Sequence, residues 1–560
     1  MPRDSVQHIE HGSRENSPRC PVAGRGASRS VRRPVGRRSS AVAVPVWSVD
    51  PRTGKQRDQV AVEAATADVD AAVRAAHAAR AALADRTARI ALLRAAAEEL
   101  EAAREEIVAT ADAETALGPV RLNGELGRTT YQLCAFADEV SDGGYLDVII
   151  DHADASLTPP RPDLRRYRIP LGVVAVYAAS NFPLAFSVPG GDTASALAAG
   201  CPVVVKAHPD HPATSELCAA ALRRAAARTG LPEDVVRLVH GFDAGVELVR
   251  HPLVAAAGFT GSIRGGRALF DAAAARPVPI PFHGELGSLN PVVVTEAAAA
   301  ERAEGIGGGL AGSMTMGCGQ FCTKPGLVLA PAGESGDRLL AVLAETLGEA
   351  APGPLLDARM REAFLAGVRA RTELADVAAP VLAAEGEGQA VGAGFLTVPA
   401  ARLAAGGAHE LLLEECFGPV TVVARYRDTD EAVAVLAKLP GNLTATLHLG
   451  EREAEGAGET GDGGGSGDGT AARLLAELTG LAGRVLVNGW PTGVAVAPAQ
   501  HHGGPYPATT STSTSVGATA IERWLRPVAY QDTPQALLPP ELHDDNPLGL
   551  PRRVDGRRES

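Results

Sequence analysis

The chain has 560 residues, of which 45% are hydrophobic and only 4% aromatic. This much apolar surface can fill a large core, and the length indicates at least two domains. The formal net charge of −13 argues against a nucleic-acid-binding protein, and the lack of an apolar run of roughly 18 to 20 residues argues against a membrane protein.

Two stretches have compositions that do not favour a packed core. Residues 1–41 are rich in arginine, with nine arginines and three acidic residues in the first 40 positions. We expect a disordered arm here, although a wrongly assigned start site would give the same composition. Arg32-Arg33 resembles an export signal, but the apolar stretch after it, AVAVPVW, is short and contains a proline. Residues 450–470 are rich in glycine and acidic side chains, which predicts a flexible surface insertion.

Helices and strands alternate in the middle of the chain. Residues 67–116 are alanine-rich with leucines at helical spacing, which predicts two or three amphipathic helices. Four β-branched runs follow, and such continuous runs are typical of strands buried on both faces. The expected strands are residues 171–180, 201–208, 235–241 and 254–261, and the expected helices are residues 186–200, 214–230 and 262–275. This order predicts an α/β fold with a parallel, doubly wound sheet.

Polar residues follow these strands, at the sheet edge where doubly wound folds bind ligands. They are Ser180 and Asn181 after the first strand, Lys206 and His208 after the second, and Thr260, Gly261 and Ser262 after the fourth. Ser262 opens a helix, so it either faces a phosphate or only caps the helix. No GxGxxG follows the first strand, and the spacing alone therefore leaves the cofactor open.

Two cysteines stand four positions apart in SMTMGCGQFCTKPG, residues 313–326. A thiol in such a loop can be a nucleophile, a metal ligand, half of a disulfide or a packing residue. The seven cysteines of the chain are an odd number at scattered positions, which predicts reduced thiols and a cytoplasmic protein. No second cysteine pair or histidine pair stands at ligand spacing, so no metal site is expected.

The order and spacing of several segments resemble the aldehyde dehydrogenase superfamily, from about residue 42 to about residue 535. The segments are YAASNFPLAF, GFTGS, FHGELGSLNP, GQFCTKPG, EECFGPV and RVLVNG. Longer stretches, such as SVPGGDTASALAAGCPVVVKAHPDHP, GGPYPATT and SVGATAIERWLRPVAYQ, are similar to an NADP-preferring branch. That branch includes ketoglutaric semialdehyde (2,5-dioxopentanoate) dehydrogenases and a long-chain fatty aldehyde dehydrogenase. The resemblance implies oxidation of ketoglutaric semialdehyde to 2-oxoglutarate, with fatty or other aliphatic aldehydes as the alternative.

The resemblance also implies the architecture. A parallel doubly wound cofactor domain, an α/β catalytic domain and a β oligomerisation arm are expected. We assign residues 42–144 and 172–286 to the cofactor domain and residues 287–495 to the catalytic domain. Residues 145–171 and 496–535 are assigned to the oligomerisation arm, and residues 536–560 to a loose tail. The arm resembles an extended hairpin followed by an apolar strand. The family pairs subunits through such strands, so a homodimer or homotetramer is expected.

Three residues carry the chemistry that the resemblance implies. Cys322 of the GQxC motif would attack the aldehyde carbon, which leaves Cys318 as a packing residue or, under oxidation, a disulfide partner. Asn181 and the Cys322 backbone N–H would hold the oxyanion, although asparagine is also a common turn residue before proline. Glu285 would activate water for thioester hydrolysis, and in an apolar cleft its pKa should be raised. The alternative for Glu285 is a surface or capping glutamate.

The cofactor residues are implied in the same way. They are Lys206 for the adenosine ribose, Gly261 and Ser262 near the pyrophosphate, and Glu415 with Phe417 at the nicotinamide ribose. NAD-specific relatives carry a glutamate shortly after the lysine, where this chain has His208 and Pro209. Lys206 and His208 are therefore candidates to hold a 2′-phosphate, and we expect NADP as the cofactor, with NAD also accepted.

Two other functions are less favoured. CoA-acylating relatives tend to lack the glutamate base, and a non-catalytic relative would not need Cys322, Glu285 and Asn181 together. The expected partner is thus a small-molecule aldehyde, with neither nucleic acid nor membrane. A dicarboxylic semialdehyde would also need a cation at the far end of its tunnel. Arg165, Arg166 and Arg168 are candidates that the sequence cannot place.

Overall fold

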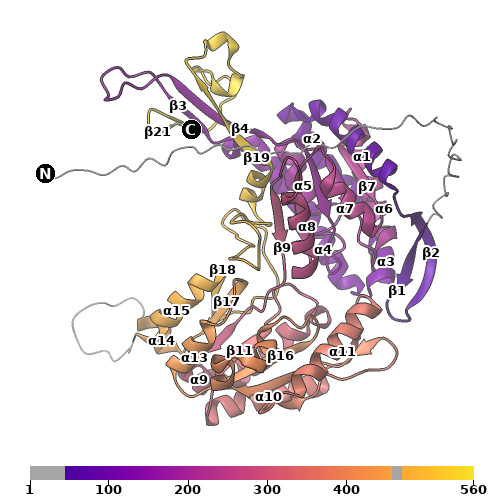
Figure 1. The fold of residues 1–560 in the computed structure, drawn as a ribbon, viewed down its shortest axis with the longest axis vertical. Coiled ribbons are helices and arrows are strands. Elements are labelled where there is room, and N and C mark those ends of the chain that lie inside the picture. Colours follow the sequence, from indigo (N-terminus) through magenta and orange to yellow (C-terminus); the bar gives the residue numbers. More distant parts are fainter. Residues whose placement is uncertain (1–43, 457–468, 560) are drawn as a thin grey trace, which may run out of the picture. The chain divides into compact units, whose positions relative to one another are not determined.

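The computed structural model describes residues 44–456 and 469–559 (Figure 1). The arm expected at 1–41 and residues 457–468 of the expected insertion lie outside these ranges. The flanks of the insertion are helical, since α14 covers Glu451–Gly456 and α15 covers Thr470–Leu481. The segment expected as a flexible insertion therefore begins with a helix at residues 451–456.

Five parallel strands form the first sheet, in the order β7-β6-β5-β8-β9. The strands are β5 (Val173–Tyr177), β6 (Val203–Lys206), β7 (Val236–Val239), β8 (Val254–Thr260) and β9 (Phe282–Glu285). The helices between them are α5 (Gly191–Ala199), α6 (Pro212–Arg228), α7 (Phe242–Arg250) and α8 (Ile263–Ala274). The four predicted strands and three predicted helices are confirmed. Helix α7 and strand β9 were not predicted, because both are short, contain a glycine and lack a long apolar run.

Four helices precede this sheet. Residues 67–116 form α1 (Thr66–Ala79), α2 (Arg86–Ala102) and α3 (Arg104–Thr115), as predicted. Helix α4 (Pro119–Asp142) follows and packs against α2 through fully buried leucines such as Leu126 and Leu133. Strands β1 (Pro45–Asp50) and β2 (Lys55–Val62) form an antiparallel hairpin.

Seven strands form the second sheet, in the order β13-β15-β16-β11-β10-β17-β18. Only β13 is antiparallel to its neighbour. The strands are β10 (Val292–Val294), β11 (Leu327–Pro331), β13 (Ala378–Val381), β15 (Gly394–Pro399), β16 (Val420–Tyr426), β17 (Asn442–His448) and β18 (Ala482–Val487). The helices are α9 (Glu296–Thr315), α10 (Glu334–Glu349), α11 (Ala358–Thr372), α12 (Ala400–Ala405) and α13 (Thr429–Leu436). A two-residue pair, β12 (Gly353–Pro354) with β14 (Ala390–Val391), forms a separate ladder.

A third sheet has the order β19-β4-β3-β20-β21. The predicted hairpin is confirmed as β3 (Val148–Asp151) and β4 (Leu164–Pro170), and the predicted apolar strand is β19 (Leu525–Gln531). The expectation of a loose tail at 536–560 is wrong, because β20 (Arg552–Val554) pairs with β3 and β21 (Arg557–Glu559) pairs with β20.

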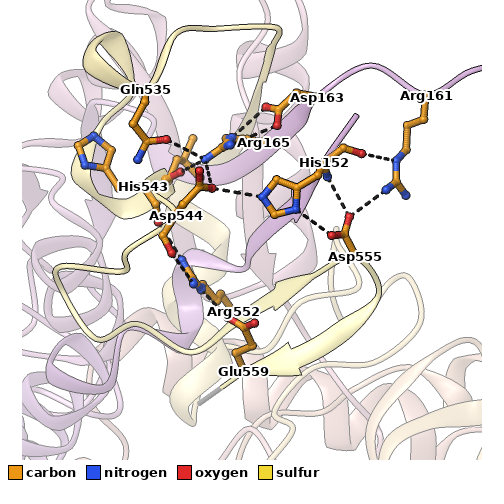
Figure 2. Close-up of polar contacts among 11 residues, drawn as sticks. His152, Arg161, Asp163, Arg165, Gln535, His543, Asp544, Arg552, Asp555 and Glu559 are labelled. Carbon is orange, nitrogen blue, oxygen red and sulfur yellow. Dashed lines mark hydrogen bonds and ion pairs between the residues drawn. The ribbon is translucent and has the colours of Figure 1, made fainter. Parts of the chain in front are cut away.

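Charged side chains attach this tail to the hairpin (Figure 2). His152 Nδ1 lies 2.8 Å from Asp555 Oδ2, and Arg161 Nη2 donates to Asp555 Oδ1 at 2.8 Å. Arg165 Nη1 forms a 2.7 Å ion pair with Asp544. The polar composition that predicted a loose segment thus supplies the carboxylates that bind the cations of the hairpin.

Within the described residues, no helix is both long and apolar enough to cross a membrane.

Candidate active site

The loop that carries Cys322 follows the end of helix α9. Residues 316–319 form a short 3-10 turn, and Gly319 within it has a φ of 69°. A Cβ at this position would collide with the backbone of Gly418, so the turn requires glycine. Asn290 Nδ2 then donates to the Cys322 carbonyl at 2.8 Å. The small residues therefore hold Cys322 in a tight, anchored turn.

Cys318 has a packing role. Its side chain packs against the core of the second sheet, and its Sγ donates to the Gly353 carbonyl at 3.3 Å. Burial raises the pKa of its thiol to about 11. Cys318 and Cys322 are both free thiols, so the structure has the packing arrangement rather than the disulfide.

Asn181 lies on the loop after β5, against the loop of the nucleophile. Its side-chain Nδ2 donates to the Gln320 carbonyl at 3.0 Å, which uses one of the two N–H groups of this amide. The backbone N–H of Cys322 has no acceptor within the described part of the chain. The remaining amide N–H of Asn181 and the Cys322 N–H are therefore both free to bind an oxyanion.

Glu285 is the last residue of β9, and only 3% of it is exposed. Ser515 Oγ donates to its Oε2 at 2.5 Å, and His502 Nε2 lies 2.9 Å from its Oε1. Burial alone would raise the pKa of this carboxyl, but the charge that His502 carries when protonated, the hydrogen bonds of His502 and Ser515 and the charge of Arg523 lower it overall. The expected upward shift is wrong, because polar donors rather than an apolar cleft surround the carboxylate.

His502 is the site residue that the sequence did not reveal. Its Nε2, 2.9 Å from Glu285 Oε1, is also 3.6 Å from Cys322 Sγ. The imidazole therefore bridges the nucleophile and the base. The expected arm includes residues 502–515, but they lie against Glu285, and the arm strand begins only at Leu525. The one available signal was GGPYPATT, which directly follows His502 and resembles the same branch.

The Cys322 thiol is held in its protonated form. Burial raises its pKa well above the ordinary value of 9.0, and the charges of Glu285 and Glu415 act in the same direction, while Arg484 opposes them. Because the thiolate is the nucleophile, a neighbouring base must remove the proton. His502 is placed to do so.

The same three side chains also have the chemistry of metal ligands. The ligand atoms of Glu285, Cys322 and His502 all lie within 4.8 Å of one another. This cluster could not be predicted from cysteine spacing, because His502 is distant in sequence. Glu285 and His502 contact each other directly, and Ser515 donates to the carboxylate as well. These contacts favour Glu285 and His502 as an acid–base pair beside the Cys322 nucleophile, rather than as metal ligands.

Two residues assigned to the cofactor lie at the carboxyl ends of β6 and β8. Lys206 is 8% exposed, and its ammonium lies 4.9 Å from the ring centre of Phe242. Within the described residues no hydrogen bond or ion pair holds this ammonium, and burial lowers its pKa to about 8. A buried cation of this kind fits a ribose hydroxyl or a phosphate. Ser262 Oγ accepts from Gly265 N at 3.2 Å, so its capping role is confirmed and its contact with a pyrophosphate stays a prediction. Gly261 N donates to the Glu285 carbonyl at 3.0 Å.

His208 does not supply the positive charge expected of it. Burial and the charges of His211 and Lys206 lower its pKa well below 6.5, so the ring is neutral near pH 7. Its Nδ1 accepts from the backbone N of Asp210 at 3.3 Å. Burial and the neighbouring Asp357 raise the pKa of Asp210 to about 7, which leaves this carboxyl partly protonated at neutral pH. Lys206 and Arg359, whose guanidinium carbon lies 5.6 Å from the ring centre of the same Phe242, are thus the cations of this region.

Glu415 lies beside the strand end that carries Glu285. A Cβ at Gly287 would be 2.5 Å from Glu415 Oε2, which places the two segments in contact. Burial raises the pKa of Glu415 to about 7, and Lys324 opposes this shift. Phe417, two positions later, is half-buried. A dinucleotide needs a cation, a helix N-terminus and a carboxylate around one sheet edge. Lys206, the N-terminus of α8 and Glu415 are the candidates for these groups.

Comparisons with known proteins identify the family of the chain. Residues 39–453 match the Aldehyde dehydrogenase family. Alpha-ketoglutaric semialdehyde dehydrogenase 2 of Azospirillum brasilense is 48% identical over 478 residues, which cover 84% of this chain and 88% of that protein. Alpha-ketoglutaric semialdehyde dehydrogenase of Acinetobacter baylyi is 44% identical over 451 residues, 79% of this chain and 82% of that protein.

Solved structures show the same fold. A 3,6-anhydro-L-galactose dehydrogenase in complex with NAP has a TM-score of 0.71 at 22% identity, over 88% of this chain and 96% of that one. A 1-pyrroline-5-carboxylate dehydrogenase from Thermus with bound NAD has a TM-score of 0.71 at 22% identity, over 87% of this chain and 89% of that one. The family match covers most of the sequence and includes the nucleophile loop. The chain belongs to the aldehyde dehydrogenase family.

Proposed function

We propose that the protein oxidises ketoglutaric semialdehyde to 2-oxoglutarate, with NADP as the preferred cofactor. The observation that carries the proposal is the convergence of Cys322 Sγ, His502 Nε2 and Glu285 Oε1. It occurs in a chain 48% identical to a relative named for this substrate. The presence of Glu285 supports release of the product by water rather than by coenzyme A.

The first step forms a bond between Cys322 and the aldehyde. His502 takes the thiol proton, and the adjacent Glu285 carboxylate stabilises the imidazolium that results. Sγ attacks the carbonyl carbon, and the carbonyl oxygen becomes an oxyanion. The amides of Asn181 and Cys322 donate to this oxyanion. Losing one such donor typically slows catalysis about 100- to 1,000-fold.

The second step releases the acid. The bound cofactor supplies the acceptor for the hydride that leaves the tetrahedral carbon, after which a thioester remains on Cys322. Glu285 removes a proton from water, and the water oxygen attacks the thioester carbon. The C–S bond breaks, His502 returns the proton that it took to the sulfur, and Glu285 releases the proton from water to the solvent. The lowered pKa keeps the Glu285 carboxylate ionised at neutral pH, so it can accept this proton, although it is a weaker base than a carboxylate with a raised pKa.

NADP is the proposed cofactor because His208 and Pro209 stand where NAD-specific relatives carry a glutamate, and Glu63 and Asp210 are the carboxylates whose charges act on Lys206. Lys206 would bind the ribose or its 2′-phosphate, while Gly261 and Ser262 would approach the pyrophosphate. Glu415 and Phe417 would contact the nicotinamide ribose. Asp210, the acid closest to Lys206 in sequence, has a pKa of about 7 and repels a phosphate only in part. Steady-state kinetics with each cofactor test this, and a preference for NAD of about 100-fold would overturn it.

We also propose a homodimer or homotetramer. The third sheet keeps an unpaired outer edge on β19 and on β21, and the second sheet keeps one on β18, within the described residues. Open strand edges are commonly covered by another subunit. Size-exclusion chromatography with light scattering should return at least a dimer, and a monomer would contradict the proposal.

A covalent trap tests the chemistry. The enzyme is mixed with a slow aldehyde and NADP, quenched, and analysed by peptide mass spectrometry. We expect the acyl group on Cys322. Cys322→Ala should abolish NADPH formation without weakening cofactor binding, while Cys318→Ala serves as the matched control and should remain active. An adduct on Cys318, or none at all, would refute the assignment.

A further inference from the structure

Two arginines of helix α4 lie beside the nucleophile loop. Arg121 and Arg128 are two helical turns apart, so their side chains project from the same face of the helix. Arg121 Nη2 donates to the Asn181 carbonyl at 2.6 Å. A Cβ at Gly317 would collide with Arg121 Nη1. The Arg121 guanidinium thus touches both an oxyanion residue and the loop that carries Cys322.

Aromatic rings surround both guanidinium groups. Arg121 Cζ lies 5.0 Å from the ring centre of Phe182 and 4.5 Å from that of Phe321. Arg128 Cζ lies 5.2 Å from the ring centre of Phe186, which is itself 6.1 Å from the ring centre of His502. Both cations therefore lie next to the reacting groups, in surroundings of low polarity where charged contacts are strong.

Most of their N–H groups have no partner. Nε and Nη1 of Arg121 and both Nη atoms of Arg128 are buried without a hydrogen bond to any described residue. Arg128 Nε alone is used, as a donor to the Val494 carbonyl at 3.3 Å. Buried charged donors without acceptors are unfavourable, and a protein retains them chiefly where a ligand supplies the acceptors.

Glu125, on the same helix face, balances at most one of the two charges. Its Oε1 accepts from the backbone amides of Leu184 (2.8 Å) and Ala185 (2.9 Å), and its Oε2 has no partner in the described chain. Burial raises its pKa, although the charges of Arg121 and Arg128 oppose the shift. The charge of Glu285 also acts on Arg128, but neither carboxylate forms an ion pair with either guanidinium in the described chain, so the free N–H groups are open to a ligand.

The arginines considered from the sequence are already paired elsewhere. Arg165, Arg166 and Arg168 lie on β4 in the third sheet. They form ion pairs with Asp163 (2.9 Å), Asp147 (2.6 Å) and Glu522 (2.9 Å), respectively. Their charges are satisfied within the arm, so they are poor candidates for binding a substrate.

We propose that Arg121 and Arg128 bind the carboxylate of the aldehyde substrate, at the end opposite the carbon that Cys322 attacks. The inference rests on the proposed function and names the groups that select its substrate. A 2-oxo acid presents two carboxylate oxygens and a neighbouring keto oxygen, and forked guanidinium groups match such acceptors in pairs. An aldehyde without the carboxylate leaves both arginines unpaired, and a site of this kind discriminates strongly against it.

The test compares charged and uncharged aldehydes in the full-length enzyme. Arg121→Gln and Arg128→Gln are assayed with ketoglutaric semialdehyde, succinic semialdehyde and pentanal. Arg94→Gln is the matched control, because this arginine is exposed and pairs only with Asp138 in the described chain. For each α4 variant, kcat/KM for the two semialdehydes should fall about 100-fold more than kcat/KM for pentanal, mainly through KM.

A binding measurement separates recognition from turnover. Calorimetric titration of 2-oxoglutarate into Cys322→Ala should show binding that the added Arg121→Gln or Arg128→Gln change weakens by a similar factor. Lysine at either position keeps the charge but not the fork, so it should restore part of the loss. It also provides a second variant should the glutamine protein not fold.

The outcomes separate the two proposals. A wild-type preference for succinic semialdehyde would refute the proposed substrate but support the arginine site. Equal losses for pentanal and the semialdehydes, or unchanged semialdehyde kinetics in the glutamine and lysine variants, would overturn the arginine site. Either result would exclude the arginine site even if ketoglutaric semialdehyde proves to be the substrate.

Discussion

Replacing His502 by glutamine should slow formation of the acyl-enzyme. In the structure the imidazole Nε2 lies 3.6 Å from Cys322 Sγ and 2.9 Å from Glu285 Oε1. Glutamine is similar in length and can hydrogen-bond to Glu285, but it cannot accept the thiol proton. His502→Gln therefore removes the proton acceptor and keeps much of the packing.

The expected decrease in the rate of acyl-enzyme formation follows from the protonation state of the Cys322 thiol. The pKa of Cys322 is well above 9.0, and each unit lowers the thiolate fraction at neutral pH about tenfold. A positioned general base typically contributes about 100- to 10,000-fold. We therefore expect the burst of NADPH to slow at least about 100-fold.

Stopped-flow absorbance with saturating aldehyde measures this burst directly. The pH dependence of alkylation by iodoacetamide gives a second readout, because it reports the thiolate without any aldehyde or cofactor. His501→Gln is the matched control, since this neighbour is half-buried and contacts neither Cys322 nor Glu285 within the described chain. An unchanged burst rate and alkylation profile in His502→Gln would refute the reasoning and leave Glu285 as the direct proton acceptor.

The remaining predictions concern the base, the cofactor and the tail. Glu285→Gln should give one burst of NADPH and then stall, because acylation survives the loss of the base that activates water; steady turnover with no burst would contradict this. Asp210→Asn should remove a pH dependence of the NADP/NAD preference: with a pKa of about 7, the carboxyl is neutral at lower pH and tolerates a 2′-phosphate, then ionises and repels it as the pH rises. Kinetics of both cofactors across the neutral range check this, and an unaltered profile in the variant would count against the role of Asp210. Asp555 raises the pKa of His152 above 6.5, so the stability from this pair is complete below pH 6.5 and lost as the pH rises through the raised value. Hydrogen-exchange protection of residues 552–559 should fall over that range, and Asp555→Asn should reduce the change to what the contact of His152 with Asp544 still contributes.

Local sequence patterns were enough for four of the five strands of the first sheet and for the tight turn before Cys322. Residues 171–261 contain β-branched runs separated by helices that end at residues such as Gly200, which takes the left-handed conformation (φ 93°). Each of these signals acts within a few residues, so it can be read directly from the sequence. The small residues around Cys322 likewise determine the tight turn, because a side chain at Gly319 would collide with Gly418.

The tail illustrates where such patterns fail. Its proline-containing, polar sequence predicts a loose segment, yet β20 pairs with β3 and Asp555 binds His152 and Arg161. The composition shows that the tail contains carboxylate side chains and that the hairpin contains basic side chains. It does not record that the two segments, about 400 positions apart in sequence, lie side by side.

The sequence by itself determined the alternation of strands and helices and the glycine-dependent turn. Through its resemblance to known proteins, it also indicated the protein family and the candidate nucleophile. The tertiary structure decided which distant side chains meet. It brought His502 to Cys322, surrounded Glu285 with donors that reverse the expected pKa shift, and placed Arg121 and Arg128, rather than the arginines of β4, near the active-site loops. The physical reason is that periodicity and turn preference act between neighbours in the chain. Burial, charge and hydrogen bonding at the site depend on neighbours in space.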